Sequence, residues 1–218
     1  MSRPYLDPAS RDDPPVGEIV ERLPERVRKF GRYPRSDRMQ PGDLVLVCPV
    51  VDGFNSRLIQ AFQSKSHTPF DSQWIHAAAY LGDHSLVEID QGGVGVNAFH
   101  KYVGGHRIQV RRPLDLRGAP IGELTGYQVA VSALKMFKTT YNYDGLISIA
   151  ARVLRAGGDF RLTSKSKAAI CSDYYNDAVV RVLGRGAVSV KTNPFSPADL
   201  SASLNMIDID VGWARLPG

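Results

Sequence analysis

Apolar and polar residues alternate most clearly over residues 74–90, WIHAAAYLGDHSLVEID. The alternation on each side of Gly82–His84 predicts two short β-strands joined by a tight turn. His76 falls in the first of these strands, among apolar residues. A buried imidazole is costly without hydrogen-bond partners, so its position needs a reason. On this pattern alone, a hydrogen-bonded core histidine is the simplest interpretation.

The length of the turn decides which acidic side chain can reach His76. A three-residue turn at Gly82–His84 puts Glu88 and Asp90 on the face of His76, with Asp90 opposite and Glu88 diagonal. If the pairing were tightened by one residue on each strand, Glu88 would lie directly opposite His76. A two-residue turn would send both carboxylates to the other face. Either acid could therefore orient the imidazole.

The remaining hydrophobic pattern predicts both helices and strands. Strands are expected at 44–47, after the turn at Pro41–Asp43, and at 106–113. The last residues, VGWARLPG, are expected to add an edge strand. Helical spacing of apolar residues predicts helices at 56–64, 121–139 and 146–156, and one from about Cys171 to Gly184.

Composition separates an N-terminal arm from a main domain. Residues 1–40 are rich in Pro, Arg and Asp, and an apolar stripe at 16–30 is interrupted by Pro24. This predicts an irregular arm with a short or kinked helix. Residues 41–218 are expected to form one domain, which suits a chain of 218 residues with 43% hydrophobic and 22% charged positions.

Several classes of protein are disfavoured by the composition. No apolar run approaches the length of a membrane span, and residues 1–18 lack the apolar core of a signal peptide. We therefore expect a cytoplasmic protein, or one exported by a signal-independent secretion system.

The net charge is +5, but acidic residues are interspersed and nucleic-acid motifs are missing, so no nucleic-acid partner is expected. Two cysteines and scattered histidines predict neither a disulfide framework nor a metal site, and no cofactor is expected.

The two cysteines have different surroundings. Cys48 ends an apolar strand and is expected to pack in the core as a small apolar residue. Cys171 falls at the expected start of a helix, in ICSDYYNDAVV. The positive end of a helix dipole favours a thiolate, and the free N–H groups there can bind an oxyanion. Cys171 is therefore a candidate nucleophile.

Three motifs, PGDLVLV, WIHAAAYLG and LVEIDQGGVGV, together resemble the central barrel of the NlpC-type papain-like cysteine hydrolases. In that superfamily the cysteine helix usually precedes these strands, whereas here ICSDYYNDAVV follows them. That order resembles the circularly permuted branch, with its papain-like amidases and lecithin–retinol-acyltransferase-like enzymes. The resemblance covers about residues 41–200. It implies an α+β, permuted papain-like fold, in which an antiparallel sheet or half-barrel packs against helices and the catalytic cysteine lies at a helix N-terminus.

The resemblance also implies residue roles. Cys171 would be the nucleophile, His76 the general base and Glu88 the residue that orients the imidazole. Glu88 is thus preferred to Asp90 by analogy. Tyr141 would donate a hydrogen bond to the oxyanion, with Tyr143 as the alternative. Ile170 departs from the family pattern, because unpermuted members often have Asp before the cysteine.

The activity implied is metal-free amide hydrolysis through a thioester. Peptidoglycan stem peptides are the first expected substrate, and the absence of a signal peptide suggests an antibacterial effector delivered by a secretion machine and matched by an immunity protein. A lipid-directed acyl hydrolase or acyltransferase is the alternative. A binding module with an idle Cys171–His76 dyad is a third possibility.

Overall fold

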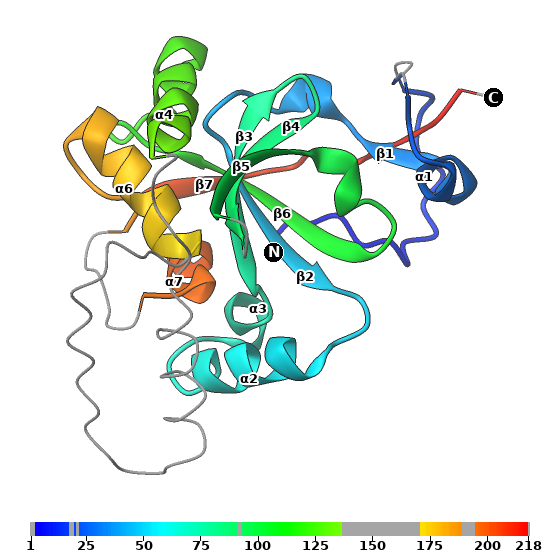
Figure 1. Cartoon of the computed structure of the whole chain (residues 1–218), viewed down its shortest axis with the longest axis horizontal. Helices are drawn as coiled ribbons and strands as arrows, with labels where there is room; N and C mark the ends of the chain where they lie inside the picture. The colour runs from blue at the N-terminus through cyan, green and yellow to red at the C-terminus, as the bar shows by residue number, and fades with distance from the viewer. Residues whose placement is uncertain are drawn as a thin grey trace.

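The computed structural model describes residues 3–17, 20, 22–90, 93–136, 171–188 and 195–217. Within these residues, six strands form an antiparallel sheet in the order β5-β4-β3-β2-β6-β7, with helices packed beside it (Figure 1). The α+β class expected from the sequence is confirmed at this level. The sheet strands are β2 (Leu44–Pro49), β3 (His76–Gly82), β4 (Ser85–Asp90), β5 (Gly93–Ala98), β6 (His106–Pro113) and β7 (Met206–Ile209).

The other elements lie around this sheet. A separate pair of short strands, β1 (Arg32–Pro34) and β8 (Trp213–Arg215), joins the beginning of the chain to its end. The α-helices in the described ranges are α1 (Glu25–Phe30), α2 (Phe54–Gln63), α3 (Pro69–Ser72), α4 (Glu123–Lys135), α6 (Cys171–Leu183) and α7 (Pro197–Ala202). The 3₁₀ helices in these ranges are η1 (Ser36–Arg38) and η2 (Phe99–Lys101). None of the helices in the described ranges is long and apolar enough to cross a membrane.

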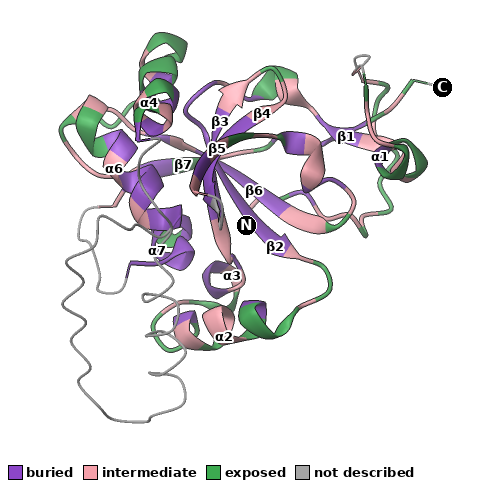
Figure 2. Cartoon of the chain, in the orientation of Figure 1, coloured by how far each residue is buried: buried purple, intermediate pink, exposed green. Residues whose placement is uncertain are grey.

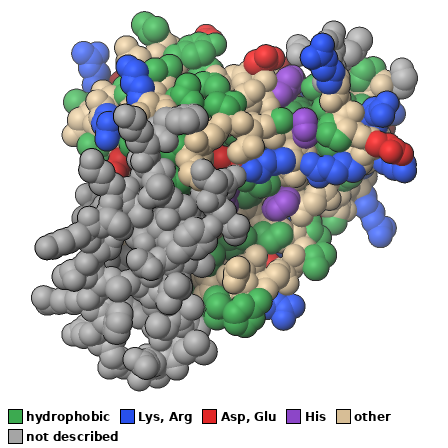
Figure 3. Space-filling view, in the orientation of Figure 1, with side chains coloured by type: hydrophobic (Ala, Val, Ile, Leu, Met, Phe, Trp, Pro, Cys, Tyr) green, Lys and Arg blue, Asp and Glu red, His purple; other side chains and the backbone are tan. Residues whose placement is uncertain are grey.

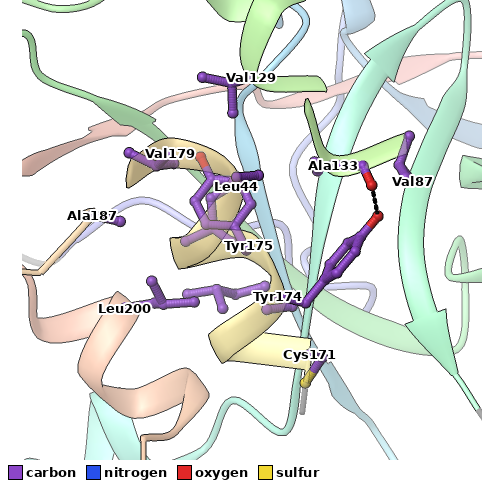
Figure 4. Close-up of a cluster of buried hydrophobic side chains, with 14 of the residues drawn as sticks. Leu44, Val87, Val129, Ala133, Cys171, Tyr174, Tyr175, Val179, Ala187 and Leu200 are labelled. Atoms are coloured by element: carbon purple, nitrogen blue, oxygen red, sulfur yellow. Dashed lines mark hydrogen bonds between the residues drawn. The ribbon is translucent and has the colours of Figure 1, made fainter. Parts of the chain in front are cut away.

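Alternation along β2, β3 and β4 gives the sheet an apolar layer on each face. On β3, Ala77 and Ala79 belong to the cluster that includes α4 and α6 (Figure 4), whereas Ala78 and Tyr80 belong to the cluster under β1 and α1. This is the period of two expected for a strand buried on both sides. The buried residues accordingly run through the middle of the sheet and the inner sides of α6 and α7 (Figure 2).

The turn between β3 and β4 contains two residues, not three. Asp83 and His84 both have positive φ, 44° and 54°, as a two-residue type I′ hairpin turn requires. Gly82 pairs with Ser85, and the register then shifts so that Tyr80 pairs with Leu86. Leu81 is the extra residue in this bulge. A two-residue turn and a one-residue bulge together have the effect of a three-residue turn.

Two close contacts fix α4 and α6 against the start of β2. Gly126 of α4 lies very near the turn that leads into β2. A Cβ atom at Gly126 would be 2.0 Å from the carbonyl oxygen of Pro41 in that turn. The hydroxyl of Tyr175 donates a 2.8 Å hydrogen bond to the carbonyl of Gly42. From the same helix, Tyr174 donates a 2.6 Å bond to the carbonyl of Ala133 in α4 (Figure 4). The three elements are therefore joined at short range.

The beginning of the chain contributes to the core. Leu6 forms an antiparallel bridge with Ile108 of β6, and Val27 and Tyr33 are buried beneath the sheet. The expected helix over 16–30 is shorter than predicted: α1 begins only after Pro24, which occupies its N-cap position. Proline lacks a backbone N–H and is tolerated at a helix start rather than inside it. The expected edge strand at the end of the chain is present as β8, paired with β1.

The predicted helices differ in outcome. Those expected at 56–64 and 121–139 correspond to α2 and α4, with ends shifted by a few residues. The helix expected near Cys171 is α6, which begins at that residue in the described range and ends before Gly184. The predicted helix at 146–156 lies outside the described residues.

Candidate active site

His76 lies at the first position of β3 and is bound on two sides. Its Nε2 atom is 2.8 Å from Oε2 of Glu88 on β4. The side chain of Cys171, at the start of α6, lies close enough to the same imidazole to raise its pKa. Because Nε2 faces the carboxylate, Nδ1 is the ring nitrogen available to the thiol. The structure thus brings together the three residues predicted as nucleophile, base and orienting acid.

Glu88 reaches His76 because of the bulge at Leu81. The pairs Tyr80–Leu86 and Ala79–Val87, continued by one step, set Ala78 opposite Glu88. Glu88 is then diagonal to His76, as a three-residue turn would have placed it. Glu88 thus lies on the face that a three-residue turn would give it, although the turn has two residues, since the extra residue lies in the strand and not in the turn.

The carboxylate of Glu88 is fully buried and binds three side chains. Besides His76, Tyr102 donates a 2.6 Å hydrogen bond to Oε2, and the ammonium of Lys101 pairs with Oε1. Lys101 and Tyr102 lie at the end of η2, beyond β5. A buried carboxylate needs such donors, because burial without them is very unfavourable.

These contacts shift the pKa values of the acid and the base in opposite directions. Burial opposes ionisation of Glu88, but the hydrogen bond and positive charge of His76, together with Lys101 and Tyr102, lower its pKa to about 2. Burial also opposes the charged form of His76, yet its interactions with Cys171 and Glu88 raise its pKa to about 10. The site therefore favours the imidazolium form of His76 beside the carboxylate of Glu88.

Cys171 is held by the packing of α6. Tyr174, Tyr175, Ala178 and Val179 form the buried stripe of this helix and contact the layer above β2 and β3. Only 5% of the surface of Cys171 is exposed. At a helix N-terminus the first backbone N–H groups have no partner within the helix, so they can bind a negatively charged oxygen.

The other predicted site residues have different outcomes. Asp90 ends β4 and pairs through its backbone with Gly93, but its side chain is outside what the structure describes. Tyr141 and Tyr143 also lie outside the described residues. Cys48 is buried, as expected, and burial together with the charge of Asp52 raises the pKa of its thiol. It is therefore a weaker nucleophile at neutral pH than an ordinary cysteine.

Lys101 and Tyr102 were missed by sequence reasoning. Both lie in the stretch FHKYVGG, more than ten residues after Glu88. Their contact with Glu88 requires β5 to run back beside β4 and η2 to form a 3₁₀ turn, and no sequence periodicity reveals either feature.

The face drawn in Figure 3 has His side chains next to Lys and Arg side chains near its middle.

Comparison with known proteins shows similarity at the level of fold. No protein-family model matches the chain, and no curated protein matches it in sequence. The crystal structure of metalloprotein yiiX from Escherichia coli O157:H7, described as DUF1105, superposes with a TM-score of 0.54 at 14% sequence identity. The match covers 83% of this chain and 99% of that chain. In the described part of this chain, no group of three or more His, Cys, Asp or Glu side chains could hold a metal ion. At 14% identity, the likeness to that structure shows the fold alone.

Proposed function

We propose that the protein is a cysteine-dependent amide hydrolase of the permuted NlpC-type papain-like class. One observation carries the proposal: the imidazole of His76 is hydrogen-bonded to the buried carboxylate of Glu88 and lies close enough to the side chain of Cys171 for that side chain to raise its pKa. The order of the residues along the chain, with the histidine strand before the cysteine helix, supports the permuted form of the fold. The antiparallel sheet against which α6 packs is compatible with it.

In the first half of the reaction, His76 accepts the thiol proton and the thiolate of Cys171 attacks the amide carbonyl carbon. The carbonyl π-electrons move to oxygen, and the resulting oxyanion is stabilised by backbone N–H groups at the start of α6. When the tetrahedral intermediate collapses, the C–N bond breaks and the imidazolium of His76 gives its proton to the leaving amine. The products of this half are an amine and a thioester on Cys171.

In the second half, water replaces the amine. His76 accepts a proton from water as its oxygen attacks the thioester carbonyl, and collapse of the second intermediate breaks the C–S bond. The carboxylic acid leaves and the thiolate–imidazolium pair is restored. Throughout the cycle Glu88 stays ionised, holds the ring and stabilises its positive charge.

The substrate class that we propose is the peptide stem of peptidoglycan, as in much of the superfamily that the motifs resemble. Delivery as an antibacterial effector, with a cognate immunity protein, is part of this proposal. The lipid-directed alternative shares the same thioester chemistry, so the test must include both substrates.

The deciding experiment compares the protein with its Cys171→Ala variant on purified peptidoglycan and on phospholipid vesicles, with products analysed by mass spectrometry. Stem-peptide fragments absent from the variant reaction would support the proposal, and released fatty acid would replace the amide substrate with an acyl ester. The catalytic assignment has its own test in iodoacetamide alkylation. If Cys171 reacts no faster than a free cysteine, and His76→Ala changes nothing, the enzyme proposal is wrong and a binding module with an idle dyad takes its place.

A further inference from the structure

Both oxygens of Glu88 are held by residues outside the predicted triad. Oε1 pairs with the ammonium of Lys101, and Oε2 accepts a 2.6 Å hydrogen bond from Tyr102 as well as the bond to His76. The carboxylate has no exposed surface, so water cannot take the place of these donors. Lys101 itself is only partly covered, with 34% of its side chain exposed.

These two donors are fixed by the core beneath η2. Phe99, the first residue of η2, is fully buried, and its N–H donates to the carbonyl of His84 at 2.7 Å. The ring of Tyr102 packs edge-on against His106 with centroids 5.0 Å apart. The ammonium of Lys101 lies 4.9 Å from the centre of the Tyr102 ring. The ring of Tyr102 therefore cannot move away from Glu88 without disturbing a packed neighbour, and the ammonium of Lys101 lies against that ring.

We propose that Lys101 and Tyr102 are positioning residues of the active site, which fix the rotamer of Glu88 and set how strongly Glu88 stabilises the imidazolium of His76. The inference rests on the proposed function, because it assigns a role in the same proton transfers. Tyr102 orients the carboxylate of Glu88 through a hydrogen bond from its neutral hydroxyl. Lys101 orients the same carboxylate and also places a positive charge beside it.

The charge of Lys101 matters because His76 must release a proton as well as accept one. A carboxylate that serves the imidazolium alone would stabilise it fully and make it a poorer acid toward the leaving amine. Lys101 divides the negative charge of Glu88 between two cations. It thus keeps the imidazolium acidic enough to complete the reaction.

Charged and titratable groups from several elements surround His76, and each of them affects how stable its imidazolium form is. Glu88 of β4 is hydrogen-bonded to the ring, and Cys171 of α6 lies close enough to raise its pKa. Burial lowers the pKa of His106 on β6, and the charges of Arg26, His76 and Lys101 add to this effect. The lowered pKa disfavours a second positive charge beside His76.

The first test measures the titration of His76 by NMR in the full chain carrying Cys171→Ala, where the thiolate no longer contributes. Adding Lys101→Met should raise the pKa of His76 by about 1 unit, because a nearby positive charge is removed. Lys101→Arg should restore the original value. Lys29→Met, which removes the same charge from an exposed site on α1, is the matched control and should change nothing. An unchanged or lowered pKa in Lys101→Met would overturn the role assigned to its charge.

The second test measures alkylation of Cys171 by iodoacetamide, with the modified peptide identified by mass spectrometry so that Cys48 is not counted. Tyr102→Phe keeps the ring and removes one hydrogen bond to a charged group, so alkylation at neutral pH should slow roughly tenfold. Thermal unfolding of the same sample shows whether the fold is retained. Unchanged alkylation in a folded Tyr102→Phe protein would overturn the positioning role. A wild-type Cys171 that is no more reactive than a free thiol would instead contradict the proposed function.

Discussion

The imidazole of His76 and the carboxylate of Glu88 are hydrogen-bonded at 2.8 Å although the two residues are diagonal in the β3–β4 ladder. Diagonal neighbours on one face of an antiparallel pair lie several ångströms apart at Cβ, within reach of long side chains. The length of the glutamate side chain closes this gap. An aspartate at position 88 would be one methylene too short for the same bond.

Glu88→Gln should weaken catalysis, because it removes the carboxylate charge and replaces the oxygen that faces Lys101 with an amide NH2 group, which cannot accept a hydrogen bond. The amide oxygen can still accept from Nε2 of His76, but the imidazolium loses its buried counter-charge. We expect the alkylation rate of Cys171 to fall on the order of 10²-fold and the alkaline limit of its pH profile to move to lower pH. Glu123→Gln, an exposed change on α4, is the control. Identical profiles for the two variants would contradict the role of Glu88.

Folding stability should depend on pH through the same pair. The pKa of Glu88 is lowered from 4.5 to about 2, so its stabilising contribution is complete above pH 4.5 and is lost as the pH falls toward 2. The pKa of His76 is raised from 6.5 to about 10, so its contribution is complete below pH 6.5 and is lost as the pH rises through 10. Urea unfolding across this range should show Glu88→Gln with a flatter acid limb than the wild type. Parallel acid limbs would rule this out.

Deletion of Leu81 should leave the site assembled. Without the bulge residue, a regular hairpin closed at Gly82 and Ser85 still pairs Tyr80 with Leu86, so Glu88 keeps its face. Deletion of Ala79 removes one residue of the ladder itself and should put His76 and Glu88 on opposite faces. Iodoacetamide reactivity of Cys171 should therefore survive the first deletion and be lost in the second. Equal loss in both would show that the bulge has a role beyond register.

Tyr175→Phe should loosen α6 without a change in packing volume. The variant removes the hydroxyl that donates to Gly42 and leaves a buried carbonyl short of a donor. We expect a loss of about 1–2 kcal/mol in the free energy of unfolding, measured by urea titration. Tyr127→Phe, on the exposed side of α4, should cost much less. Comparable losses in the two variants would mean that the Gly42 bond adds little.

Gly126→Ala should be strongly destabilising although alanine favours helices. The new methyl group would lie 2.0 Å from the backbone oxygen of Pro41, which cannot yield as a flexible side chain could. A loss of about 3 kcal/mol in the free energy of unfolding is expected. Gly122→Ala is the matched control, because nothing lies within 4 Å of a Cβ at that position. A stable Gly126→Ala protein would show that α4 can move away from the turn.

Much of the site could be predicted because its residues lie in locally regular sequence. The alternation around His76 and the helical stripe after Cys171 each set a side chain at a known place in its element. The meeting of His76 and Cys171 was expected only from the resemblance of three motifs to a family, since nothing local in the sequence joins residues so far apart.

The parts that could not be predicted depend on long-range contact or irregular backbone. Nothing in YLGDHS distinguishes a three-residue turn from a two-residue turn with a bulge at Leu81, because both satisfy the same alternation. The pairing of β1 with β8 joins the two ends of the chain and has no local signal. Trp74 lies two residues before His76, but it precedes β3 and packs in the same cluster as Ala77 and Ala79, since strand alternation does not extend beyond the strand.

The hydroxyl groups of Tyr174 and Tyr175 link chemical competence to the last stage of folding. The imidazole and the carboxylate come from one hairpin of contiguous sequence, which can form early because its contacts are local. The thiol joins them only when α6 docks, and that docking is fixed by the bonds to Ala133 and Gly42. A chain in which the sheet has formed but α6 is detached carries an ordinary, unassisted cysteine. Reactivity of Cys171 would therefore report on completed assembly, and partly folded molecules would be chemically harmless.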